Sequence, residues 1–178
     1  MSESDRKGID MMIEIREARA ADAEKMIECC KALGAESDNL TFGAEGISFS
    51  VEQEAEFLEK LHKSDKDFYL IAVDGDEVVA TASISCYGKK RLAHRGEISI
   101  AVRKSHWGRH IGSEMMAKML EFAKNTAKAE IISLEVRSDN ERAKALYKKF
   151  GFETIGVFDG FMKINGEYVS CDIMRLAL

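Results

Sequence analysis

Proline is absent from this 178-residue sequence, and so are internal repeats and low-complexity linkers. Such segments commonly mark the boundaries between domains, so their absence leaves no point at which to divide the chain. The length is that of one ordinary domain, and 46% hydrophobic residues suffice for a sizeable core. The sequence therefore predicts a single domain over residues 11–178, preceded by a flexible polar tail at residues 1–10.

An excess of basic residues is also missing, because the formal net charge is −5. A negative protein is poorly suited to neutralising a phosphate backbone. The longest apolar runs have only the length of a strand, and the first residues, MSESDRKGID, lack the apolar core of a signal peptide. We therefore expect a cytoplasmic protein that binds neither nucleic acid nor a membrane.

Cysteine is scarce, and its spacing does not suit a metal site. The four cysteines are Cys29, Cys30, Cys86 and Cys171, with no C-x-x-C pair among them. Two adjacent cysteines cannot chelate zinc in the manner of a zinc ribbon. We expect reduced cysteines that are mostly part of the core, and no bound metal.

Hydrophobic periodicity predicts an α/β (α+β) protein with the element order β-α-α-β-β-β-α-β-α-β-β. The strands are expected at residues 12–19, in two runs within 67–87, at 95–102, at 131–136, and in two final runs around Asn165-Gly166. The helices are expected at residues 20–33, 50–63, 111–125 and 140–150.

Local turn signals support these boundaries. The sequences Asp74-Gly75-Asp76 and Asn165-Gly166 favour tight hairpins, because their residues tolerate positive φ angles. Ser50 followed by Gln53 is typical of a capping box at a helix start. Gly151 suits the end of the last helix.

The stretch VRKSHWGRHIGSEM, residues 102–115, joins an expected strand to an expected helix. Small residues at such a junction expose backbone N–H groups at the positive end of the helix dipole, where an anion such as a pyrophosphate can bind. Glycine before a helix is more often simple turn chemistry. The sequence has no G-x-G-x-x-G and no G-K-S or G-K-T, which argues against a dinucleotide fold and a nucleotide P-loop.

One helix and one strand later comes the pattern N-x-x-A-x-x-L-Y-x-x-x-G-F, made of Asn140, Ala143, Leu146, Tyr147, Gly151 and Phe152. In order and spacing, these two segments resemble the GNAT superfamily of acyl-CoA-dependent N-acyltransferases. The resemblance covers nearly the whole chain. It implies a central mixed, mostly antiparallel sheet of about seven strands with four helices, and acetyl-CoA as the co-substrate.

The pyrophosphate signature of that family is Q/R-x-x-G-x-G/A. Aligned without gaps, Trp107 takes the Q/R position, His110 takes the first glycine and Gly112 keeps the last. Arg109 is then the expected charge partner for phosphate, or else a solvated surface cation. The resemblance implies these cofactor-binding residues: Ile100, Ala101, Val102, Trp107, Gly108, Arg109, His110, Ile111, Gly112, Ser113, Asn140 and Tyr147.

The resemblance also suggests roles within the second pattern. Asn140 would bind the pantetheine end of the cofactor, and Tyr147 would protonate the leaving thiolate. Each residue has a structural alternative, because Asn140 suits a helix N-cap and Tyr147 suits the core. The family further implies that a backbone N–H of the strand at 95–102 stabilises the oxyanion.

Acyl transfer to an amine also needs a group that accepts a proton, because a lysine-like amine is almost entirely charged at neutral pH. Along the strand at 95–102, Ile98, Ile100 and Val102 share one face, which leaves Glu97 on the other. Glu97 is the first candidate for the catalytic base, or else a structural glutamate paired with Arg95 or Arg137. The other candidates are Glu36, Asp38 and Glu135.

The sequence thus predicts an N-acetyltransferase that moves an acetyl group from acetyl-CoA to a primary amine by direct attack in a ternary complex. A small-molecule amine is favoured as the acceptor, and a homodimer is possible. Two alternatives stay open. One is acetylation of peptide or ribosomal-protein N-termini, because both segments also resemble that branch. The other is a CoA-binding regulator with weak catalysis, which the imperfect phosphate signature permits.

Overall fold

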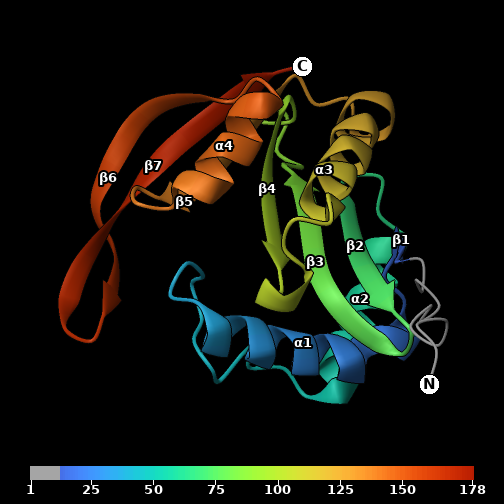
Figure 1. Cartoon of the computed structure of the whole chain (residues 1–178). Coiled ribbons are helices and arrows are strands. Elements are labelled where there is room, and N and C mark those ends of the chain that lie inside the picture. Colours follow the sequence, from blue (N-terminus) through green and yellow to red (C-terminus); the bar gives the residue numbers. More distant parts are fainter. Residues whose placement is uncertain (1–12) are drawn as a thin grey trace, which may run out of the picture.

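The computed structural model describes residues 13–178, which form a seven-stranded sheet with helices on both faces (Figure 1). The tail predicted at residues 1–10 lies outside the described residues. The strand order is β1-β2-β3-β4-β5-β7-β6, and β4 pairs with β5 in parallel while the other neighbours are antiparallel. The strands are β1 (Glu14–Glu17), β2 (Asp67–Asp74), β3 (Glu77–Cys86), β4 (Arg95–Val102), β5 (Ile131–Arg137), β6 (Glu153–Ile164) and β7 (Glu167–Ala177).

The helices are α1 (Ala23–Glu36), α2 (Val51–His62), α3 (Ile111–Phe122) and α4 (Glu141–Lys149). The predicted fold class and element order are therefore confirmed. Helix α1 starts three residues later than predicted, because Ala20–Asp22 forms a separate 3-10 turn. Helix α3 also ends early, because Ala123–Ala127 continues it as a π-helical turn. Such short elements leave too little periodicity to be found in a sequence.

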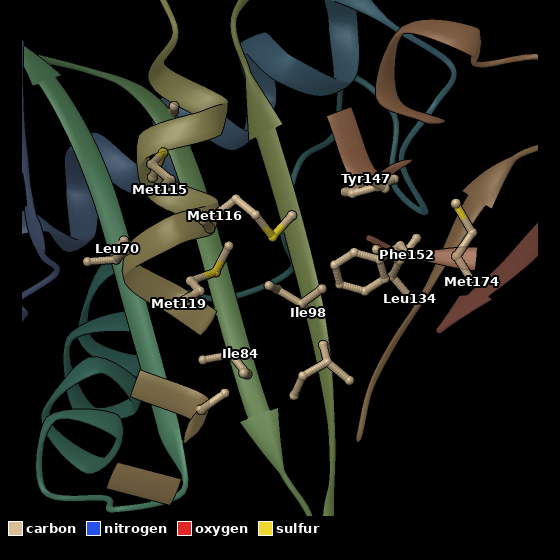
Figure 2. Close-up of a cluster of buried hydrophobic side chains, with 14 of the residues drawn as sticks. Leu70, Ile84, Ile98, Met115, Met116, Met119, Leu134, Tyr147, Phe152 and Met174 are labelled. Atoms are coloured by element: carbon tan, nitrogen blue, oxygen red, sulfur yellow. The ribbon is translucent and has the colours of Figure 1, made fainter. Parts of the chain in front are cut away.

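Alternating residues of the strands build a separate core on each face of the sheet. Leu70 of β2 belongs to the cluster under α3 and α4, whereas its neighbour Ile71 belongs to the cluster under α1 and α2. Figure 2 shows the first cluster, in which methionines of α3 lie beside Ile98 of β4, with Tyr147 of α4 further along. Strand β2 is thus packed on both faces of the sheet.

The predicted turn chemistry is confirmed. The backbone N–H of Gln53 donates to Ser50 Oγ at 3.2 Å, and the Ser50 N–H donates to Gln53 Oε1 at 2.9 Å, which closes the capping box of α2. In the hairpins, the φ angles of Gly75, Asn165 and Gly166 are 61°, 52° and 88°. These left-handed conformations favour glycine and asparagine.

Strands β4 and β5 diverge soon after they meet. They pair only at Arg95 with Ile131, Gly96 with Ile132, and Glu97 with Ser133. Beyond these pairs, β4 runs on to Val102 and β5 to Arg137 without a shared ladder. The facing edges are left with N–H and C=O groups for a ligand to bind, which makes this divergence the feature that positions the site.

Helix α2 carries a carboxylic acid in the protein interior. Glu54 is 2% exposed, and no cation among the described residues forms an ion pair with it. Burial raises the pKa of its carboxyl group. The folded chain therefore holds this proton more tightly than the unfolded chain, whose glutamates titrate near pH 4.5. The cost of ionising Glu54 grows as the pH rises above that value.

We expect Glu54→Gln to stabilise the protein at pH 8 by about 1–3 kcal/mol, the range for an uncompensated buried polar group. The gain should shrink as the pH falls toward 4.5 and should vanish below it, where Glu54 becomes neutral in the unfolded state as well as in the folded state. Thermal unfolding at pH 5 and pH 8 measures this difference. The matched control is Glu56→Gln on the exposed side of α2. Equal effects of the two variants at both pH values would refute the prediction.

Candidate active site

A cavity of about 620 Å³ opens where β4 and β5 diverge. Its wall includes every predicted cofactor-binding residue except Arg109, and it includes Tyr147 but not Glu97. The wall also contains residues of the segment after α1, of α4 and of β6. The fold therefore brings together the two sequence patterns that are separated by α3 and β5.

The first turn of α3 forms one end of the cavity, through His110, Ile111, Gly112 and Ser113. His110 precedes the helix as its N-cap with a φ angle of 61°. This left-handed conformation explains why the family signature has glycine here, and histidine is among the residues that tolerate it. The helix start offers backbone N–H groups and the positive end of the dipole, which together suit an anion.

Two side chains that follow the end of β4, those of His106 and Arg109, contact Asp74 at the β2–β3 hairpin. Asp74 accepts a hydrogen bond from His106 Nε2 at 3.0 Å and another from Arg109 Nη1 at 3.1 Å. These bonds lower the pKa of Asp74. The predicted contact between Arg109 and phosphate stays a prediction, and the structure pairs this guanidinium with a carboxylate.

The start of α3 packs against Leu146 of α4 at Gly112. A Cβ atom at this position would lie 3.3 Å from Leu146 Cδ2 and 3.9 Å from Ile100 Cδ1. A side chain at this position would require the Leu146 side chain to shift, so a small residue fits the packing. Gly112 is thus explained by close packing as well as by the helix start.

Asn140 and Tyr147 face the cavity from α4. Asn140 is the N-cap, because its Oδ1 accepts the backbone N–H of Ala143 at 3.1 Å. The cap uses only the side-chain oxygen, so it does not require the NH₂ group. Tyr147 is 6% exposed, and burial raises its pKa to about 12. Its phenol therefore keeps its proton at neutral pH, as a hydrogen-bond donor must.

Two candidate bases occupy neighbouring strands. Glu135 of β5 lines the cavity, and burial raises its pKa, as does the negative charge of Glu97. Glu97 of β4 is exposed and accepts a hydrogen bond from the Tyr87 hydroxyl. Arg137, which the sequence offered as a structural partner for Glu97, forms an ion pair with Asp139 at 2.6 Å. The sequence therefore ranked first the carboxylate that lies outside the cavity wall.

Glu36 and Asp38, the remaining candidate bases, take part in backbone and arginine contacts. Burial alone would raise the pKa of Glu36, but hydrogen bonds from the Lys104 N–H at 2.8 Å and Arg103 Nε at 3.1 Å lower it. The backbone oxygen of Asp38 accepts a hydrogen bond from Arg137 Nη1 at 3.3 Å. The contacts of the Glu36 carboxylate therefore fit a structural role, while the carboxylate of Asp38 stays a predicted candidate outside the cavity wall.

The segment after α1 and strand β6 border the cavity beyond Tyr147. Asn39, Thr41 and Phe42 come from the segment, while Phe161 and Met162 come from β6. Sequence reasoning missed Phe161, Met162 and Arg142, because only the packing of distant strands and helices brings these residues to the cavity wall.

Gly34 allows α1 to pass this segment closely. A Cβ atom there would lie 1.8 Å from the backbone oxygen of Gly43, which no side chain permits. The segment is therefore held directly against the end of α1.

The four cysteines are free and buried, as predicted.

Among residues 13–178, no three His, Cys, Asp or Glu side chains gather as a metal site requires. No helix in that part of the chain is both long and apolar enough to cross a membrane.

The sequence profile of the acetyltransferase (GNAT) family matches residues 35–152. This match spans most of the chain, both sequence patterns and most of the cavity wall. The chain belongs to this family.

Curated relatives include two enzymes with different acceptors. The L-amino acid N-acetyltransferase AaaT of Escherichia coli is 34% identical over 102 residues, which are 57% of this chain and 62% of the relative. The N-alpha-acetyltransferase RimI of Mycobacterium tuberculosis is 31% identical over 103 residues, 58% of this chain and 63% of the relative. The matched region thus spans less than two thirds of either relative.

Solved structures agree over nearly the whole chain. An acetyltransferase of the GNAT family from Streptococcus pneumoniae has a TM-score of 0.90 at 26% identity, covering 94% of this chain and all of that one. YncA of Salmonella typhimurium, solved with its cofactor acetyl-CoA, has a TM-score of 0.80 at 16% identity, covering 93% and 94% of the two chains. The second likeness is one of fold alone.

Proposed function

We propose that this chain acts in the cytoplasm as an N-acetyltransferase that moves the acetyl group of acetyl-CoA to a primary amine of a small molecule. Residues 11–178 serve as the single catalytic domain. The observation that carries this proposal is one cavity that joins a helix start suited to phosphate, an open strand edge and a carboxylate with a raised pKa. Family membership supports it independently.

The residues of the cavity fit the parts of acetyl-CoA. The N–H groups at the start of α3 suit its diphosphate. The open edge of β4 suits the amides of its pantetheine arm, since Ile100, Ala101 and Val102 line the wall. A β4 backbone N–H is the donor that we assign to the oxyanion of the tetrahedral intermediate. Tyr147 then donates a hydrogen bond to the departing sulfur.

The acceptor must lose a proton before it can attack. An amine with a pKa of about 10.4 is neutral in roughly 1 of 2,500 molecules at pH 7. Glu135 lies at the cavity wall, and its raised pKa makes it a stronger base than a glutamate with an ordinary pKa. We propose Glu135 as the proton acceptor, with Glu97 raising its pKa. Glu97 remains the catalytic base that the sequence alone predicts.

The residues at the acceptor side of the cavity are compatible with a small amine. The segment after α1 and residues Phe161 and Met162 border the cavity where the amine would enter. Among the relatives, AaaT is named for L-amino acids, whereas RimI is named for N-alpha-acetylation. Acetylation of a peptide N-terminus is therefore the second candidate, since its terminal amine resembles that of an amino acid.

Release of CoA thiol from acetyl-CoA tests the proposal, with matched panels of amino acids, other small amines, and peptides that begin with the same amino acids. We expect kcat/KM to be higher for at least one free small amine than for every peptide. Faster reaction of a peptide would show N-terminal acetylation. Calorimetric binding of acetyl-CoA without turnover on either panel would show a CoA-binding regulator.

A further inference from the structure

The phosphate end of the cavity has a tryptophan where the family signature has glutamine or arginine. The indole of Trp107 donates its one N–H to the backbone oxygen of Val102, at 2.7 Å. This bond fixes the ring at the end of β4. Trp107 therefore cannot replace the missing polar side chain by donating to phosphate itself.

A guanidinium from another element lies on this ring. The Cζ atom of Arg142, the second residue of α4, is 3.8 Å from the centroid of the Trp107 ring. Both residues line the cavity together with Gly108 and the first turn of α3. Stacking uses the face of a guanidinium and leaves its N–H groups at the edge, where they can bind an anion in a fork.

The charge of Arg142 is not neutralised by an acid of the described chain. Burial alone lowers its pKa, and no ion pair with a carboxylate of residues 13–178 accompanies it. Arg109, by contrast, is bound to Asp74 and lies outside the cavity wall. Arg142 remains accessible at the cavity wall, so an anionic ligand there can reach the N–H groups at the edge of its guanidinium.

We propose that Arg142, held by stacking on Trp107, binds the diphosphate of acetyl-CoA and replaces the side chain that the family signature carries at position 107. This inference rests on the proposed function. Trp107 is a positioning residue in it, because its ring orients the guanidinium and does not touch the phosphate. The pair joins α4 to the end of β4 at the start of α3.

The test is the affinity of the full chain for CoA and for dephospho-CoA, which keeps the diphosphate and lacks the 3′-phosphate. We expect Arg142→Met to weaken both ligands equally, by about 10- to 100-fold, because bidentate guanidinium contacts to phosphate are strong. Lys148→Met on the same helix removes the same charge outside the cavity wall and should change neither affinity by more than about twofold. Thermal unfolding checks that each variant is folded.

Three outcomes would overturn the proposal. A loss confined to CoA would place Arg142 on the 3′-phosphate instead. Unchanged affinity in Arg142→Met, with a large loss in Lys104→Met, would assign the phosphate to Lys104, whose Nζ lies 6.0 Å from the same ring centroid. Failure of the unmodified chain to bind CoA would reject the proposed function as well, and that result is distinct from the first two.

A double-mutant cycle tests the role of Trp107. We expect Trp107→Leu to weaken CoA binding by about 5- to 10-fold, and to add almost nothing to Arg142→Met, because both changes remove one contact. Independent losses that multiply would show that Trp107 does not act through Arg142. Trp107 is the only tryptophan of the chain, so its fluorescence reports this stack alone and should respond to CoA in the unmodified protein.

Discussion

Replacing Glu135 by glutamine is expected to lower kcat at pH 7 by about 10²–10⁴-fold, the usual contribution of a general base. The change keeps the shape of the side chain at the cavity wall and removes its basicity. The affinity for acetyl-CoA should stay within about twofold, because the carboxylate serves the amine. Turnover and calorimetric binding, both at saturating acceptor, measure the two effects.

The pH profile separates a base from a structural glutamate. A higher pH deprotonates the amine in advance, so Glu135→Gln should recover activity with a slope near one in log rate, and weakly basic amines should suffer less. The matched comparison is Glu97→Gln on the neighbouring strand. Because the negative charge of Glu97 raises the pKa of Glu135, we expect this second variant to shift the acidic limb of the profile to lower pH, with a smaller loss of kcat.

The opposite ranking would reassign the base. If Glu97→Gln lost more activity and showed the recovery at high pH, the carboxylate that sequence reasoning placed first would be the proton acceptor. A loss that is uniform in pH and in amine basicity, for both variants, would exclude both glutamates as bases. An ordered water would then be the remaining candidate.

Removing the hydroxyl of Tyr147 is expected to slow turnover by about 10- to 150-fold, since a hydrogen bond to a charged group is worth about 1.5–3 kcal/mol. The phenol has a pKa of about 12, whereas an ordinary thiol titrates near 8.5. A raised phenol pKa makes complete proton transfer to the thiolate less favourable than it would be from an ordinary phenol. We therefore expect Tyr147 to act as a hydrogen-bond donor, with an effect smaller than that of Glu135.

Tyr147→Phe tests this role, because the ring that packs against Phe152 is preserved. We expect kcat to fall while the affinity for acetyl-CoA and the melting temperature stay nearly unchanged. Phe152→Leu is the matched control for packing, and it should lower the melting temperature with a smaller effect on kcat. Equal kcat in Tyr147→Phe and the unmodified protein, with chemistry rate-limiting, would leave Tyr147 as a core residue only.

The sequence by itself determined the elements and their order. Hydrophobic periodicity found all seven strands and four helices, and turn residues found both hairpins and the cap at Ser50. These features depend on φ and ψ preferences and on contacts between residues a few positions apart, so each leaves its mark in a short stretch of sequence. The two motifs likewise identified the part of the cavity wall formed by the end of β4, the start of α3 and helix α4.

Only the tertiary structure decided which charged side chains meet the cavity. Glu97 and Glu135 both lie on central strands, and the point at which β4 and β5 diverge puts Glu135 at the wall. Arg109 lies within the phosphate motif but binds Asp74, 35 residues earlier in the sequence, whereas Arg142 of α4 lines the cavity wall. The physical reason is that long charged side chains reach across elements. Their partners are set by the packing of distant segments, about which the local sequence holds no information.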